Sequence, residues 1–210
     1  MKTNSKIRNM ALMAIMGALA AVLMMFSFNM PGMPTFLKMD FGQIPELFAG
    51  FFIGPWAGVV VALIKNVLNI MFLGTGTAFA GEIMNFLGSS IFVLIAGYVY
   101  KLNRTKKGAL IGLVVASVVG TLLWNALNEF IAFPMYANLY GLTMEQIVQM
   151  GSVVNPYIHD EMTLIWFGVF PFNIIKHAVL SAVTWIVYKR IANALRGILH
   201  MELEKEEALA

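Results

Sequence analysis

The sequence has few charged residues and no cysteine. Charged side chains make up 12% of its 210 residues, whereas a soluble domain carries about 25%. Apolar residues make up 60%, in runs long enough to cross a bilayer. The lack of cysteine excludes disulfides, thiolate metal sites and cysteine nucleophiles. These features predict one integral membrane domain, residues 1–210, with no room for a second fold.

The sequence also lacks the motifs of catalysis and nucleotide hydrolysis. His159, His177 and His200 lie far apart, without the spacing of metal ligands. There is no P-loop lysine, so the chain is not expected to hydrolyse ATP by itself. Neither GxSxG nor HExxH is present. We expect a protein that is not an enzyme, holds no metal and no cofactor, and has no nucleic-acid partner.

Apolar runs and helix breakers predict an all-α membrane protein with six transmembrane helices. Proline and glycine in MPGMPTFLKMDFG end the first helix, and Gly54-Pro55 separates the second from the third. The second is shorter than the roughly 20 residues of an upright span, so we expect other helices to shield it. A short amphipathic helix is expected at residues 143–150. The predicted spans are residues 7–29, 43–53, 55–73, 83–100, 109–133 and 164–190, followed by a charged cytoplasmic tail at 191–210.

Basic residues cluster in three segments and predict the orientation. Three of the 14 basic residues precede the first span, four lie between the fourth and fifth, and four follow the last. The positive-inside rule places all three segments in the cytoplasm. This requires an even number of crossings on each side of the middle segment, and four plus two satisfies it. Both termini are therefore predicted inside, and residues 30–42, 74–82 and 134–162 outside.

Polar residues recur in the outer halves of the predicted helices. A charged side chain at membrane depth costs about 3 kcal/mol or more, so it normally faces the bundle interior or water. Each residue alone has an ordinary explanation: Glu82 suits a helix N-terminus, and asparagines join helices by hydrogen bonds. Together they predict an outward-facing pocket for a small ligand with many hydrogen-bonding groups. Its polar members are Glu82, Asn85, Asn128, Asn173 and Lys176, and its candidate walls are Phe36, Leu37, Met39 and Phe79.

Small residues form a stripe on the first helix. Ala11, Ala14, Gly17, Ala18 and Ala21 recur at spacings of three and four, which lets another helix approach closely. That helix belongs either to the same bundle or to another subunit, and spacing alone leaves both possibilities open.

Four segments, in order, resemble the riboflavin-specific S components of energy-coupling factor (ECF) transporters. They are PTFLKMDFGQIPEL at 34–47, GPWAGVVVALIKNVLN at 54–69, GEIMNF at 81–86 and PFNIIKH at 171–177, and the similarity extends over residues 7–190. The resemblance implies an S-component-like bundle in a prokaryotic cell membrane that captures riboflavin from outside without catalysis. It also implies a transmembrane coupling protein and two cytoplasmic ATPases as partners, with Ala14 and Ala18 in the docking surface.

The resemblance further implies where the ligand binds. In WNALNEF, Asn125 and Asn128 are alternatives for one position. The candidate ligand-binding residues are Phe36, Leu37, Lys38, Met39, Asp40, Asn69, Phe79, Glu82, Asn85, Asn125, Asn128, Asn173 and Lys176. Three other interpretations stay open: an S component for folate, thiamine or a queuosine precursor; a membrane-embedded enzyme acting on lipid; and a channel or stand-alone carrier.

Overall fold

The structure is a computed structural model that describes the backbone of residues 2–208 and the side chains of residues 5–139, 141–195 and 197. Helices make up most of it. A short antiparallel pair, β1 (Phe28–Asn29) with β2 (Lys38–Met39), follows the first helix. The helices in chain order are α1 (Lys2–Met25), α2 (Gln43–Phe52), α3 (Pro55–Leu73), α4 (Ala80–Leu102), α5 (Lys106–Leu127), η1 (Asn128–Ala132), α6 (Phe133–Tyr140), α7 (Met144–Ser152), α8 (Glu161–Leu164), η2 (Ile165–Val169) and α9 (Phe170–Ala208).

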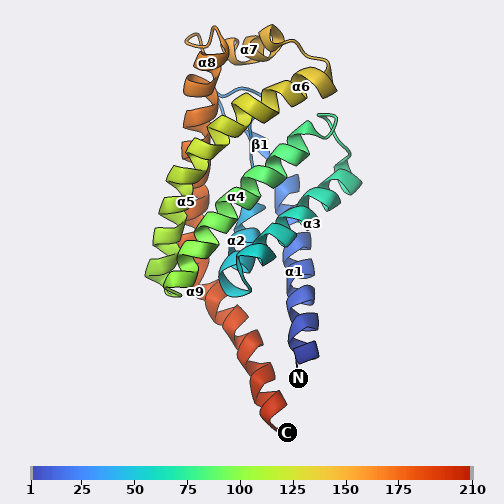
Figure 1. Ribbon diagram of the computed structural model, residues 1–210, viewed down its shortest axis with the longest axis vertical. Coiled ribbons are helices and arrows are strands. Elements are labelled where there is room, and N and C mark those ends of the chain that lie inside the picture. The colour runs from blue at the N-terminus through green and yellow to red at the C-terminus, as the bar shows by residue number, and fades with distance from the viewer. Residues whose placement is uncertain (1, 209–210) are drawn as a thin grey trace.

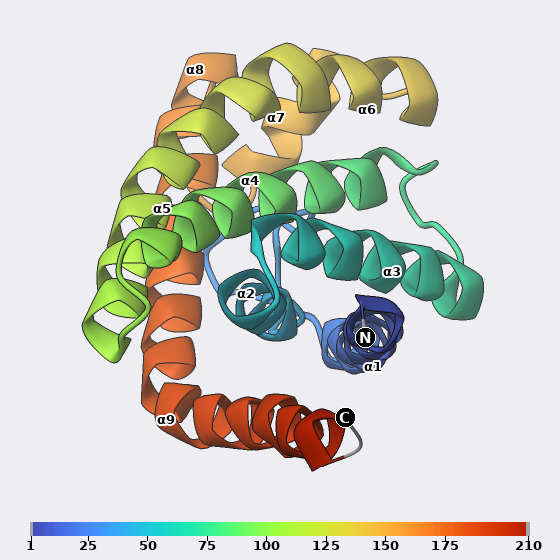
Figure 2. The same cartoon turned by 60° about the horizontal axis from the view of Figure 1, so that its bottom comes forward.

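Five helical segments of the described chain are long and apolar enough to cross a membrane: Ser5–Met25, Pro55–Leu73, Ala80–Leu102, Lys106–Leu139 and Glu161–Leu195. They form a bundle in which α1 begins and α9 ends at the same end (Figure 1). The second predicted span, α2, has only 10 residues. It lies inside the bundle between α1, α3, α4 and α9 (Figure 2). Most of its side chains are buried. The expected shielding of this helix is confirmed.

Aromatic residues of α2 pack the half of the bundle nearest to the start of α1. Phe51 and Tyr100 have ring centroids 4.7 Å apart, and the hydroxyl groups of Tyr100 and Tyr188 lie 2.9 Å from each other. Lipid tails are as apolar as these side chains, so close packing and interhelical hydrogen bonds, more than the hydrophobic effect, hold membrane helices together. The cluster therefore fixes α2 against α4 and α9.

The first helix begins and ends earlier than predicted. It ends at Met25, and the expected extension to residue 29 is wrong because Phe28 and Asn29 pair with Met39 and Lys38 instead. Residues 30–42 then form a connection that runs from β1 across the bundle to α2, and we call it the strap. The fourth helix begins at Ala80, three residues earlier than predicted.

The last two spans extend further than predicted. Each contains a π-helical segment, η1 or η2, directly before a Phe-Pro pair at the start of α6 or α9. Proline lacks the N–H that would bond the carbonyl four residues earlier, so the local helix changes register. The carbonyl freed by Pro171 belongs to Phe167, and the side-chain amide of Asn155 donates to it at 3.2 Å. In the fifth span, η1 and α6 continue the helix past the predicted end at residue 133 as far as Tyr140, where a loop was expected.

The segment after Tyr140 contains the expected amphipathic helix, α7. Thr143 and Gln146 form its capping box: each side chain accepts a hydrogen bond from the backbone N–H of the other. Such reciprocal bonds satisfy donors that the first turn leaves free. At the other end of the chain, the predicted charged tail is helical to Ala208, and residues 209–210 lie outside the described part.

Candidate ligand-binding site

A cavity of about 460 Å³ opens between the strap and helices α3, α4, α5 and α9. It lies where α1 and α3 end and α4 begins, away from the start of α1. Small-molecule sites occupy roughly 300–1,000 Å³ and combine apolar walls with a few fixed polar groups. This cavity has the right size for one small organic ligand.

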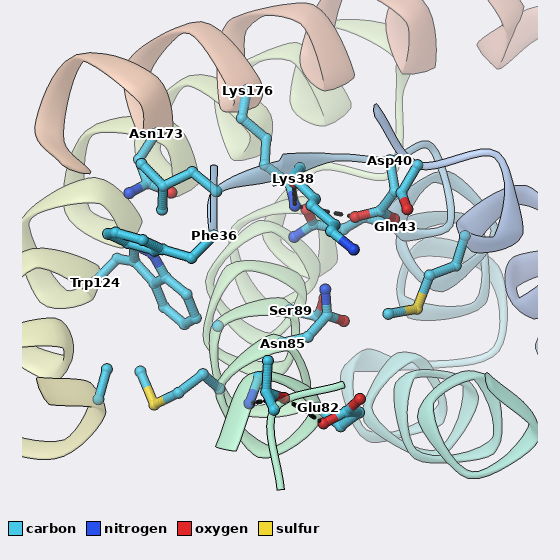
Figure 3. Close-up of a pocket in the computed structure, with 18 of the residues that line it drawn as sticks. Phe36, Lys38, Asp40, Gln43, Glu82, Asn85, Ser89, Trp124, Asn173 and Lys176 are labelled. Atoms are coloured by element: carbon cyan, nitrogen blue, oxygen red, sulfur yellow. Dashed lines mark hydrogen bonds and ion pairs between the residues drawn. The ribbon is translucent and has the colours of Figure 1, made fainter. Parts of the chain in front are cut away.

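Lys176 of α9 ties the strap to the cavity wall. Its Nζ donates to Asp40 Oδ2 at 3.0 Å and to the carbonyl of Lys38 at 3.4 Å (Figure 3). The other carboxylate oxygen of Asp40 accepts from the backbone N–H of Gly42 at 3.0 Å. Burial by itself raises the pKa of Asp40, but the ammonium groups of Lys176 and Lys65 outweigh it and hold the pKa below its usual 3.8. Asp40 is thus a carboxylate that anchors the strap.

Two asparagines present hydrogen-bond acceptors to the cavity. The side-chain N–H of Asn128 donates to the carbonyl of Trp124, and that of Asn173 donates to the carbonyl of Val169, each at 2.8 Å. Both bonds run to the residue four positions earlier in the same helix, so they fix the amides without a second helix. Each Oδ1 atom is left to accept a hydrogen bond, and a ligand N–H or O–H suits that position.

The connection between α3 and α4 supplies a carboxylate. Thr75 and Thr77 donate from their hydroxyl groups to Glu82 Oε2, at 3.1 and 2.9 Å. One turn further along α4, Asn85 Oδ1 is buried and has no hydrogen-bond partner among the described residues. A buried acceptor without a partner costs about 1–3 kcal/mol, so a donor from a ligand would be favourable there.

Aromatic rings line the side of the cavity near η1. Phe36 of the strap and Tyr136 of α6 have ring centroids 6.2 Å apart. Trp124 of α5 lies beside Phe36 (Figure 3). Gly88 of α4 makes room for the indole of Trp124, because a β-carbon at that position would overlap the ring. Flat apolar surfaces of this kind accommodate an aromatic ligand.

Comparisons with known proteins identify the family of this bundle. The family model described as "ECF transporter, substrate-specific component" matches residues 8–188. The chain belongs to this family. The predicted resemblance to S components is confirmed, and with it the expectation of a multi-pass membrane transport protein that is not an enzyme.

Three relatives are similar over nearly the whole chain. "Riboflavin transporter RibU" of Staphylococcus aureus (strain TCH60) is 36% identical, over 88% of this S component and 90% of that protein. "Riboflavin transporter FmnP" of Bacillus subtilis (strain 168) is 28% identical, over 89% of this chain and 93% of that one. A solved structure described as "Structure and mechanism of the S component of a bacterial ECF transporter" is 34% identical, with a TM-score of 0.71 over 90% of this chain and 98% of the other.

Most of the predicted ligand residues of this S component meet at the cavity. Those that line it are Phe36, Leu37, Lys38, Asp40, Asn69, Glu82, Asn85, Asn128, Asn173 and Lys176. Three others lie elsewhere. Met39 is buried in the strand pair, Phe79 is half exposed just before α4, and Asn125 lines a smaller recess with Glu129 and Trp166. The two alternatives in WNALNEF are thereby separated, since only Asn128 lies at the cavity.

Several lining residues had no signal in the sequence. Trp124, Tyr136 and Phe172 are aromatic residues in apolar stretches, where such side chains are ordinary packing. Gln43 and Ser89 are uncharged polar residues. The free-energy cost of such residues at membrane depth is too low to distinguish a site residue from one that joins two helices. Only the proximity of Gln43 to the predicted outer segment 30–42, and of Ser89 to Asn85, could have marked these two.

The small-residue stripe of α1 divides between two surfaces. Gly17 and Ala21 are buried, and a β-carbon at Gly17 would overlap Ile64 of α3. Ala14 and Ala18 are exposed on the other face of α1. The stripe therefore serves close packing inside the S component and also leaves a smooth outer face.

Proposed function

We propose that this S component captures riboflavin in the 460 Å³ cavity and delivers it for ATP-driven uptake. The observation that carries the proposal is the combination of flat aromatic walls with fixed polar groups around one cavity. The isoalloxazine ring needs flat apolar contacts and hydrogen-bond partners for its pyrimidine edge, and the ribityl chain needs several more. The names of the relatives in two organisms agree with this ligand.

The proposed topology has six passes, with α2 as the short second pass. The start of α1, the connection from α4 to α5 and the body of α9 beyond residue 189 carry the basic clusters, and they gather at one end of the bundle (Figure 1). The positive-inside rule assigns that end to the cytoplasm. The cavity, near the opposite end, then faces the outside of the cell membrane.

The proposed partners are a transmembrane coupling protein and two cytoplasmic ATPases of an ECF module. The family description supports a module in general terms. The exposed face of α1 around Ala14 and Ala18 is the proposed contact, because small side chains allow a foreign helix to approach closely. Riboflavin is the transported ligand and no cofactor is required.

An equilibrium titration tests the ligand. We expect the purified protein to quench the fluorescence of added riboflavin, with saturation at one riboflavin per chain and no competition from thiamine or folate. Saturation with thiamine or folate instead would assign the protein to another vitamin. Riboflavin uptake by liposomes that contain this chain alone would support a stand-alone carrier and contradict the proposed dependence on ATPases.

A further inference from the structure

Lys65 of α3 lies directly beneath the cavity and is completely buried together with Glu46 of α2. Its Nζ lies 2.5 Å from Glu46 Oε1 and 3.3 Å from the hydroxyl oxygen of Ser89 on α4. Ser89 lines the cavity, whereas Lys65 and Glu46 stand behind it. One ammonium group thus connects three helices at the cavity floor.

The aliphatic stem of Lys65 also supports the end of the strap. A β-carbon at Gly42 would lie 2.9 Å from Lys65 Cδ, 2.6 Å from the carbonyl of Ala20 and 3.1 Å from Asp40 Oδ1. Only glycine leaves room for the strap to pass so close to α1 and α3. The ammonium of Lys65 further attracts the carboxylate of Asp40, as does the ammonium of Lys176.

Stability alone does not account for this pair. Replacing a buried ion pair with apolar residues of similar volume is often neutral or stabilising, because taking two charges out of water is expensive. What this pair adds is a defined position for the Lys65 ammonium, which is held by its ion pair with Glu46 and by its hydrogen bond to Ser89. Three parts of the cavity boundary lie next to the pair: the strap at Asp40 and Gly42, the first turn of α2, and Ser89.

We propose that Lys65, paired with Glu46, is a positioning residue for ligand capture. It holds the strap and Ser89 at the distances that the ligand requires, without touching the ligand itself. The proposal rests on the proposed function, because its affinity test uses riboflavin as the probe.

The double variant Lys65→Met with Glu46→Met tests the proposal, because it removes both charges and leaves neither buried alone. We expect it to fold with a melting temperature close to that of the wild type. Its Kd for riboflavin should rise by about tenfold or more, because the strap and Ser89 are then no longer held at the distances that the ligand requires. Lys107→Met, at an exposed lysine far from the cavity, is the matched control and should leave Kd unchanged. Wild-type affinity in the double variant would overturn the proposal.

A second readout needs no ligand. The chain has no cysteine, so spin labels at Thr35→Cys on the strap and Ile174→Cys on α9 report one distance distribution. We expect this distribution to broaden or shift in the double variant, and an unchanged distribution would overturn the proposal. If the double variant does not fold, the double variant Lys65→Gln with Glu46→Gln, which also removes both charges and is closer in shape, serves instead, with the same two outcomes. A wild-type protein that does not bind riboflavin would contradict the proposed function but not the positioning role of Lys65, because the distance measurement does not use riboflavin.

Discussion

Single residues of the cavity are fixed by bonds within their own helix. Asn128 and Asn173 each bond the carbonyl four residues earlier, so their free oxygens point to constant positions before any ligand arrives. A pre-organised acceptor loses little entropy on binding. Asn125, by contrast, lines a separate recess of the surface.

These amides give a matched set of variants. Asn128→Ala and Asn173→Ala should each raise the Kd for riboflavin by about tenfold, or 1.4 kcal/mol, because a ligand donor loses its partner. Asn125→Ala is the control and should bind as the wild type does. Fluorescence titration measures all three, and equal Kd values for the Asn173 and Asn125 variants would remove Asn173 from the site.

The ionisation of Asp40 predicts how riboflavin affinity varies with pH. The pKa of Asp40 is lowered by its lysine neighbours, so its ion pair with Lys176 contributes fully above the ordinary carboxyl pKa of 3.8. The contribution is lost only as the pH falls through the lowered value. We expect riboflavin affinity to be flat from about pH 5 to pH 8, where Asp40 stays ionised. A tenfold loss of affinity within that range would contradict this role of Asp40.

The site residues that the sequence could predict are those that are expensive in a membrane. Lys176, Glu82 and the asparagines stood out because an apolar background makes polar groups costly. Trp124 and Tyr136 could not be recognised, since aromatic residues are equally common in simple packing. Lys65 is likewise a charged residue inside a predicted span, but its contact with Glu46 depends on the tertiary arrangement of α2 and α3.

Among the elements, α1 has two faces with different tasks. The face of Gly17 and Ala21 packs against α3, and the face of Ala14 and Ala18 is free in the described structure. Periodicity predicted the stripe but could not divide it, because both faces use the same small residues. Helix ends were also hard to predict, since strand pairing of Phe28 and the π segments before the Phe-Pro pairs depend on neighbouring elements.

The free face of α1 predicts a separation of binding from transport. Ala14→Trp or Ala18→Trp should change riboflavin affinity by less than about 0.5 kcal/mol, as is usual for exposed positions. Uptake by liposomes containing the complete ECF module and ATP should fall to background, because the indole blocks close approach. Ala178→Trp, at an exposed alanine of α9, should retain both. Loss of riboflavin binding in the α1 variants would show that this face packs internally.

At the scale of the whole molecule, the cavity and the basic clusters occupy different ends of the bundle (Figure 1). The sequence predicted this separation, because the basic residues fall in segments expected in the cytoplasm and the costly polar residues fall in the outer halves of the spans. The sequence also predicted that the short α2 would be shielded by other helices, but which helices enclose it, α1, α3, α4 and α9, became visible only in the structure.

The absence of native cysteine makes the proposed topology measurable. A membrane-impermeant maleimide should label Glu145→Cys, on α7, in intact cells. It should label Lys107→Cys, in the first turn of α5, only after the membrane is permeabilised. Both positions are exposed in the structure, so access to water decides the result. The reverse labelling pattern would invert the proposed orientation.

The most direct test of the central claim is the visible spectrum of the protein purified from flavin-producing cells. Bound riboflavin should make the preparation yellow, and extraction should release about one riboflavin per chain, as expected for a single site of this size. A colourless protein that leaves the fluorescence of added riboflavin unquenched would contradict the assignment of riboflavin to this cavity.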